Sequence, residues 1–139
     1  MYTSDSLLGI NRIKPAERRL GFIATGLVVA ALLLDGTLQL LTVPAIAHAA
    51  SEIGFSTDSK VWRIIGVVLV LSTALYAIPR TAFLGAILIT GFLGGTICAH
   101  VRIGEGAFAP VIVAFVLATL TWGGLWLRDQ RIRTLVSGA

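Results

Sequence analysis

The sequence has few charged residues. They make up 13% of its 139 residues, whereas hydrophobic residues make up 56% and the mean hydropathy is +0.90. A typical soluble domain has about a quarter charged residues, which cover its water-exposed surface. This chain cannot cover such a surface, so a soluble globular domain is excluded. The composition indicates an integral membrane protein, and the length suits a single domain over residues 1–139.

Cysteine and histidine are also scarce. The single cysteine, Cys98, excludes an intrachain disulfide and any C-x-x-C redox pair. The two histidines, His48 and His100, lack the spacing of metal ligands on one helix, so no metal site is predicted. No glycine-rich phosphate loop, H-E-x-x-H motif or nucleophile elbow is present. The net charge of +4 comes without a basic stripe and interleaved aromatic residues, which disfavours nucleic acid as a partner.

Long apolar segments are what the sequence does have. A hydrocarbon core about 30 Å thick requires roughly 20 mainly apolar residues in a helix. The first such segment follows Arg18 and Arg19 but is too long for a cleavable signal peptide, so we expect it to be retained. The sequence predicts an all-α, integral membrane four-helix bundle. Its four spans cover about residues 20–42, 61–78, 81–100 and 107–127.

The distribution of Lys and Arg predicts the orientation in the membrane. Eight of these residues fall on one side of the predicted spans and three on the other. Cytoplasmic loops collect Lys and Arg. We therefore expect a multi-pass protein of the inner membrane with both termini in the cytoplasm. The first group is Arg12, Lys14, Arg18, Arg19, Arg80, Arg128, Arg131 and Arg133, and the second is Lys60, Arg63 and Arg102.

The connections between the predicted spans are short, which favours antiparallel neighbours. Between the second and third spans, Pro79 stops one helix, Arg80 marks the cytoplasmic face and Thr81 is expected to cap the next helix. The longest connection, residues 43–60, lies on the opposite side. We expect it to form a lid or a short interfacial helix.

The third predicted span is rich in small residues at helical spacing. Gly91, Gly94 and Gly95 belong to two such rows. In lipid, helices associate where small residues let their backbones approach closely. The pattern predicts that this span packs centrally in the bundle through these glycines. The alternative is that the Gly91-x-x-x-Gly95 row forms the interface of a homo-oligomer.

The informative polar residue is Asp35, which lies within the first span near the outer third of the bilayer. A carboxylate at that depth costs a few kcal/mol, and such groups usually face the bundle interior. Asp35 is either a structural group held by an ion pair or hydrogen bond, or a ligand contact or proton acceptor. In both cases we expect it to point inward and to find a partner, with Arg63 or Arg102 as the first candidates.

Other polar residues are predicted at the same level of the membrane. Gln39 follows Asp35 by one helical turn, Arg63 opens the second span, and His100 and Arg102 close the third together with Glu105. Each has a simpler explanation, because arginines extend to lipid headgroups and a single histidine at a helix end is commonly interfacial. Together they predict a small outward-facing polar pocket. Its residues are Asp35, Gln39, Arg63, His100 and Arg102.

Several segments resemble the DoxX-like family of small bacterial membrane proteins. They read "LYAIPRTAFLGAILITGFLGGTICAHVRIGE", "WGGLWLRDQRIRTL" and "LLLDGTLQLL", and the resemblance covers roughly residues 18–135. Relatives tend to carry lysine at the position of Gln39. The resemblance implies a four-helix membrane bundle. Founding DoxX proteins resemble a subunit of a thiosulfate:quinone oxidoreductase, and others associate with redox-defence partners. The wider fold is similar to that of vitamin K epoxide reductase, whose chemistry requires the paired cysteines that this chain lacks.

Three functions are compatible with these observations. The first is a membrane subunit or a binder of a lipophilic, quinone-like ligand, without catalysis of its own. The second is a subunit of a quinone-linked oxidoreductase, with a redox protein as partner, in which Asp35, His100 and Arg102 handle protons at the outer face. The third, a small transporter, is disfavoured because one charge within the four spans gives little pathway. Quinone is the only cofactor candidate, and the lipid bilayer is the expected surrounding.

Overall fold

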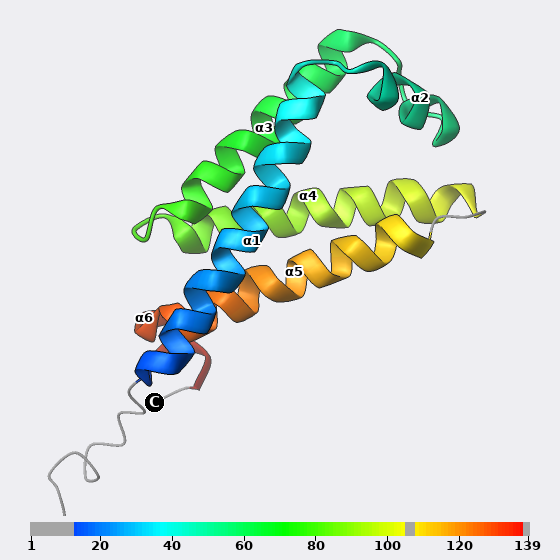
Figure 1. Cartoon of the computed structure of the whole chain (residues 1–139). Helices are drawn as coiled ribbons and strands as arrows, with labels where there is room; N and C mark the ends of the chain where they lie inside the picture. Colours follow the sequence, from blue (N-terminus) through cyan, green and yellow to red (C-terminus); the bar gives the residue numbers. More distant parts are fainter. Residues whose placement is uncertain (1–12, 105–107, 138–139) are drawn as a thin grey trace, which may run out of the picture.

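A computed structural model of the chain describes residues 13–104 and 108–137, which form six helices and no strand. Four of the helices are long and apolar enough to cross a membrane. They are α1 (Pro15–Leu40), α3 (Ser59–Ala77), α4 (Ala82–Ile103) and α5 (Phe108–Arg128). Two shorter helices, α2 (Pro44–Glu52) and α6 (Gln130–Ser137), follow α1 and α5 (Figure 1). The all-α fold with four spans is therefore confirmed.

The helix ends agree with the predicted spans to within a few residues. The largest difference is at α1, which begins at Pro15 because proline is pre-organised for the first helical position. Thr81 is the N-cap residue of α4, as expected, but its side chain makes no capping hydrogen bond; the hydroxyl donates instead to the Leu75 carbonyl at 2.8 Å. Residues 43–60 contain the expected short helix, α2.

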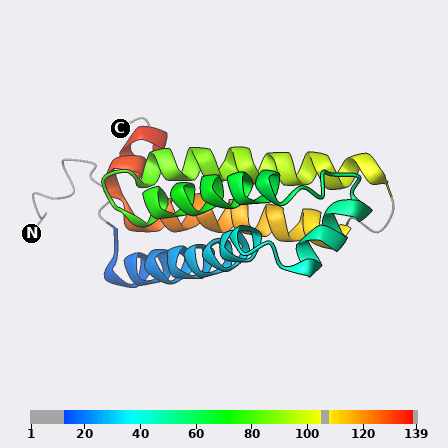
Figure 2. The same cartoon turned by 90° about the horizontal axis from the view of Figure 1, so that it is seen from above.

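The four long helices form a ring in which each packs against two neighbours. Helix α1 has extensive contacts with α3 and α5, and α4 has extensive contacts with the same two helices. Figure 2 shows the four helices running side by side. The prediction that the third span, α4, occupies the centre of the bundle is therefore wrong, because none of the four long helices lies in the middle of the other three.

Close helix contacts are made at glycines that the sequence analysis did not single out. A Cβ atom on Gly66 of α3 would lie 2.9 Å from the Gly36 carbonyl oxygen of α1, so these two backbones approach with no room for a side chain. A Cβ atom on Gly85 of α4 would collide with the backbone of Tyr76 in α3. These approaches are the membrane form of packing at small residues, found along α1–α3 and α3–α4.

The two ends of the bundle differ. The arginine-rich end comprises the start of α1, the α3–α4 hairpin and α6, whereas the cavity end comprises α2, residues 53–58 and the end of α4. Figure 1 shows the α1–α3 pair and the α4–α5 pair diverging from the arginine-rich end toward α2. At the arginine-rich end the fully buried Tyr76 donates to the Thr121 carbonyl of α5 at 2.8 Å. Arg128 donates to the Tyr76 carbonyl, also at 2.8 Å.

Candidate functional site

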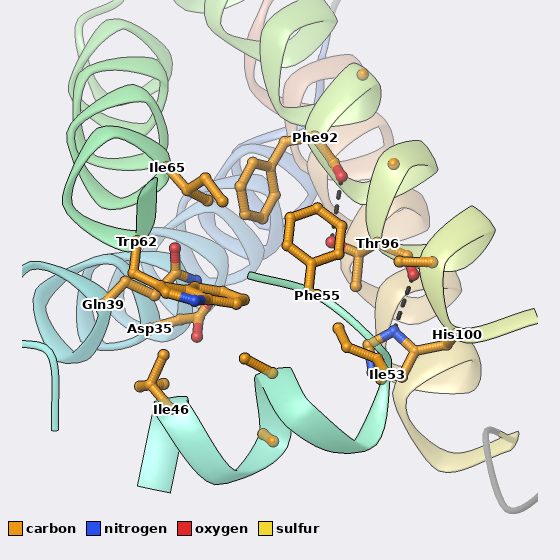
Figure 3. Close-up of a pocket in the computed structure, with 15 residues that line it drawn as sticks. Asp35, Gln39, Ile46, Ile53, Phe55, Trp62, Ile65, Phe92, Thr96 and His100 are labelled. Atoms are coloured by element: carbon orange, nitrogen blue, oxygen red, sulfur yellow. Dashed lines mark hydrogen bonds between the residues drawn. The ribbon is translucent and has the colours of Figure 1, made fainter. Parts of the chain in front are cut away.

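A cavity of about 440 Å³ lies where the two helix pairs diverge. Helices α1, α3 and α4 form its walls, while α2 and the segment after it cover it (Figure 3). Its volume is within the range of small-molecule sites. The lining residues are Asp35, Gln39, Ile46, Ala49, Ala50, Ile53, Phe55, Trp62, Ile65, Gly91, Phe92, Gly95, Thr96, Ala99 and His100.

Most of the cavity wall is apolar and aromatic. The rings of Phe55 and Trp62 pack with their centroids 5.8 Å apart, and Phe92 lines the wall from α4. Two hydrogen bonds hold the segment that carries Phe55. The Trp62 indole N–H donates to the Ser56 carbonyl at 2.6 Å, and Arg102 Nη2 donates to the Ile53 carbonyl at 2.9 Å. The aromatic wall is thus fixed from both α3 and α4.

One side of the cavity is polar and comes from α1. Gln39 Nε2 donates to Asp35 Oδ2 at 2.9 Å, as the spacing of one helical turn permits. Gln39 is only 5% exposed, and its Oε1 atom is buried without a hydrogen-bond partner among residues 13–104 and 108–137. A buried acceptor left without a donor costs free energy. A ligand that donates a hydrogen bond to Gln39 would remove that cost.

His100 provides a second polar group, from α4. Its Nδ1 atom lies 2.9 Å from the Thr96 carbonyl oxygen. A carbonyl oxygen can only accept, so Nδ1 carries the hydrogen, and in the neutral ring Nε2 is then an acceptor. Figure 3 shows the ring beside Ile53 at the edge of the cavity. Polar groups therefore lie on α1 and on α4, with the aromatic wall between them.

The structure brings three of the five predicted pocket residues together. Asp35, Gln39 and His100 line the cavity, whereas Arg63 and Arg102 do not. Arg63 follows the lining residue Trp62, and one residue turns a helix by about 100°, so Arg63 is directed away and is exposed. The predicted ion pair of Asp35 with Arg63 or Arg102 is wrong: its hydrogen-bond partner is Gln39. Glu105 lies outside the described residues.

The three glycines predicted to pack α4 are also placed differently. A Cβ atom on Gly91, Gly94 or Gly95 would have no atom of the described chain within 4 Å, apart from its own helix. Gly91 and Gly95 instead line the cavity. The prediction that the three glycines pack against another helix of this chain is therefore wrong, and α4 turns the face that carries Gly91 and Gly95 toward the space left by the divergence. A homo-oligomer interface stays a prediction.

Sequence reasoning missed the aromatic wall and the cover of the cavity. Trp62 has the position of an interfacial tryptophan, and the sequence signal for that role is the same as for a cavity wall. Phe55, Ile46 and Ala50 come from the long connection, where only its length indicated a covering role. Within the described part of the chain, no three His, Cys, Asp or Glu side chains gather as a metal site would require.

The sequence profile of the DoxX-like family matches residues 23–124, more than half of the chain. The chain belongs to the DoxX-like family. The match includes every residue that lines the cavity of this DoxX-like protein. Family membership and the four spans together make the DoxX-like chain a small multi-pass membrane protein. Comparison with curated proteins and with solved structures gave no significant match.

Proposed function

We propose that this DoxX-like protein binds, in the cavity between α1, α3 and α4, a lipophilic ligand whose polar head donates hydrogen bonds, as a quinol does. The single observation that carries the proposal is Gln39 Oε1, a buried acceptor that has no donor among the described residues and that belongs to a side chain lining the cavity. Aromatic and aliphatic side chains around it suit a flat, apolar ligand body.

The balance of donors and acceptors favours a quinol over a quinone. Gln39 Oε1 and, in the neutral ring, His100 Nε2 are acceptors, and an ionised Asp35 adds a further one. The Trp62 N–H and one Gln39 N–H are already bonded within the protein. A quinol carries two hydroxyl donors at opposite ends of its ring, whereas a quinone carries two carbonyl acceptors. The acceptors on α1 and α4 thus complement the reduced form.

A subunit of a quinone-linked oxidoreductase is the second candidate function. The observation that favours it is that Asp35 and His100, two side chains able to accept protons, line the same cavity. Oxidation of a bound quinol would release two protons and two electrons, and the electrons would have to pass to a partner redox protein. Ligand binding without such a partner is the simpler function, and it is tested first.

The fluorescence of Trp62 provides the test, because this tryptophan lines the cavity. In a Trp122→Phe/Trp126→Phe background, Trp62 is the remaining tryptophan. We expect a short-chain quinol, kept reduced, to change its emission in a saturable way and to bind more tightly than the matching quinone. Gln39→Leu should weaken quinol binding about tenfold, the equivalent of about 1.4 kcal/mol, with little change for the quinone.

Two adjacent glycines give a matched pair for the same experiment. Gly95→Leu places a side chain in the cavity, whereas Gly94→Leu changes the same helix at a position outside its lining. We expect Gly95→Leu to abolish binding and Gly94→Leu to preserve it. Equal binding by both variants would show that the ligand lies elsewhere, and equal affinity for quinol and quinone in the parent and in Gln39→Leu would remove the role assigned to Gln39.

We further propose that the chain lies in the inner membrane with the arginine-rich end in the cytoplasm and the cavity end outside. The support is the eight-to-three distribution of Lys and Arg. A reporter active only outside the cytoplasm should give no signal when fused to the C-terminus. The same reporter inserted after Thr57, between α2 and α3, should be active. The opposite pattern would reverse the orientation.

A further inference from the structure

A second cavity, of about 300 Å³, lies at the opposite end of the bundle from the first. Four arginines line it, and each comes from a different segment: Arg18 from α1, Arg80 from the α3–α4 hairpin, Arg128 from the end of α5 and Arg131 from α6. The tendency of arginines to collect at the cytoplasmic face requires only that they lie at this end. It does not require that they converge on one cavity.

Within the part of the chain that the structure describes, the positive charge of this cavity is only partly neutralised. None of the four guanidinium groups is in an ion pair in the part of the chain that the structure describes, where the recorded pairs are His48–Glu52 and Arg133–Glu17. Among the described residues that line the cavity, Asp129 carries the one carboxylate, and its Oδ1 accepts from the backbone N–H of Arg131 at 2.9 Å. Four cations thus face one anion.

Two of the arginines are held in place without a counter-ion. Arg128 donates to the Tyr76 carbonyl at 2.8 Å and lies over the Tyr76 ring, 5.0 Å from its centroid. Its Nε atom is buried and has no hydrogen-bond partner among the described residues. Arg18 lies over the ring of Phe22, 5.7 Å from its centroid. Stacking on aromatic rings orders a guanidinium group before any anion arrives.

We propose that this cavity binds a phosphate group. Guanidinium groups bind phosphate oxygens through paired, charge-assisted hydrogen bonds, and several converging arginines are a common arrangement for this chemistry. The phosphate comes either from the headgroup of an anionic lipid or from free phosphate. Phe22, which lines the cavity from the exposed face of α1, gives the site an apolar side that a lipid also uses.

The experiment compares two double variants that remove the same charge at opposite ends of the bundle. Arg80→Gln/Arg131→Gln changes two exposed side chains of the cavity that have no side-chain partner among the described residues. Lys60→Gln/Arg63→Gln is the control at the opposite end of the bundle, near the first cavity. Retention of added phosphatidylglycerol and of added phosphatidylcholine is measured by native mass spectrometry of the purified full-length chain. Thermal stability without added lipid verifies that both variants fold.

We expect the parent and the control to retain phosphatidylglycerol in preference to phosphatidylcholine. Arg80→Gln/Arg131→Gln should retain about tenfold less phosphatidylglycerol than the parent.

If millimolar inorganic phosphate displaces the lipid or raises the melting temperature of the parent but not of Arg80→Gln/Arg131→Gln, the site takes free phosphate as well. If the lipid is retained and phosphate has neither effect, the headgroup is the source. Equal loss of phosphatidylglycerol in both double variants, or no loss in either together with no effect of phosphate, would overturn the proposal.

Discussion

The arginine-rich end and the cavity end are built from the same four helices but differ in how closely those helices pack. At the arginine-rich end, Tyr76 is fully buried and joins α3 to α5 through Thr121, while Arg133 and Glu17 form an ion pair at 3.1 Å. At the cavity end, the helix pairs diverge (Figure 1) and leave a cavity of about 440 Å³. Close packing at the arginine-rich end stabilises the fold, whereas the open space at the cavity end leaves room for a ligand.

Glycines illustrate the same contrast within one helix. Gly85 of α4 lies against the backbone of Tyr76, whereas Gly91 of the same helix faces the open cavity. The residue type is identical, but in one place its lack of a side chain permits helix contact and in the other it leaves volume. The comparison predicts that substitutions near the arginine-rich end cost more stability than substitutions near the cavity.

The largest effect is expected from Gly85→Leu. Its Cβ atom alone would collide with the Tyr76 backbone, and overpacking of this kind costs about 2 kcal/mol or more. Gly91→Leu is the matched control, because its Cβ atom has open space. Thermal unfolding in detergent should show a large loss for the first variant and a small change for the second. Similar losses for both would break the comparison between the two ends.

An intermediate effect is expected from Tyr76→Phe. The change removes the hydroxyl that donates to the Thr121 carbonyl, a buried hydrogen bond worth about 1 kcal/mol. Thr119→Ala is the control, because the exposed Thr119 hydroxyl bonds only to the Phe115 carbonyl of its own helix. Unfolding should separate the two variants. If the control loses as much stability as Tyr76→Phe, the interhelical hydrogen bond contributes no more than a surface hydroxyl.

The smallest effect on global stability is expected from Arg102→Ala. Arg102 is exposed and donates one hydrogen bond, to the Ile53 carbonyl, so its loss should cost about 0.5 kcal/mol or less. The local effect should be clearer: amide hydrogen exchange over residues 50–58 should accelerate, whereas Arg63→Ala should leave it unchanged. Unaltered exchange in Arg102→Ala would mean that Trp62 alone holds the segment.

The fold could be predicted from the sequence because each span is long, apolar and bounded by polar residues or proline. The bilayer leaves a helix as the only spanning structure for such segments. The relative placement of the helices could not be predicted in the same way. The glycine row of α4 and the glycines at the true contacts, such as Gly36 and Gly66, carry equal signals, and only the pairing of specific faces distinguishes them.

Only part of the candidate site could be predicted, again because the relative placement of the helices was not. Asp35 and Gln39 are one turn apart on the same face, so their pairing follows from helix geometry. The expected arginine partners depend on the rotation of α3 and on where α4 ends, and helical spacing within one segment does not determine either. Trp62, one residue before Arg63, faces the cavity instead. Charge complementarity alone therefore gave a wrong prediction for the partner of Asp35, which is Gln39.

The divergence of the two helix pairs has a consequence for the membrane around the protein. With 26 residues, α1 is about 39 Å long, and with 19 residues α3 is about 28 Å long. Two pairs that diverge cannot both stand along the bilayer normal, so at least one pair is tilted. Tilted helices match a thin hydrocarbon layer better than upright helices of the same length. We therefore expect ligand affinity in the cavity to vary with the acyl-chain length of the surrounding lipid.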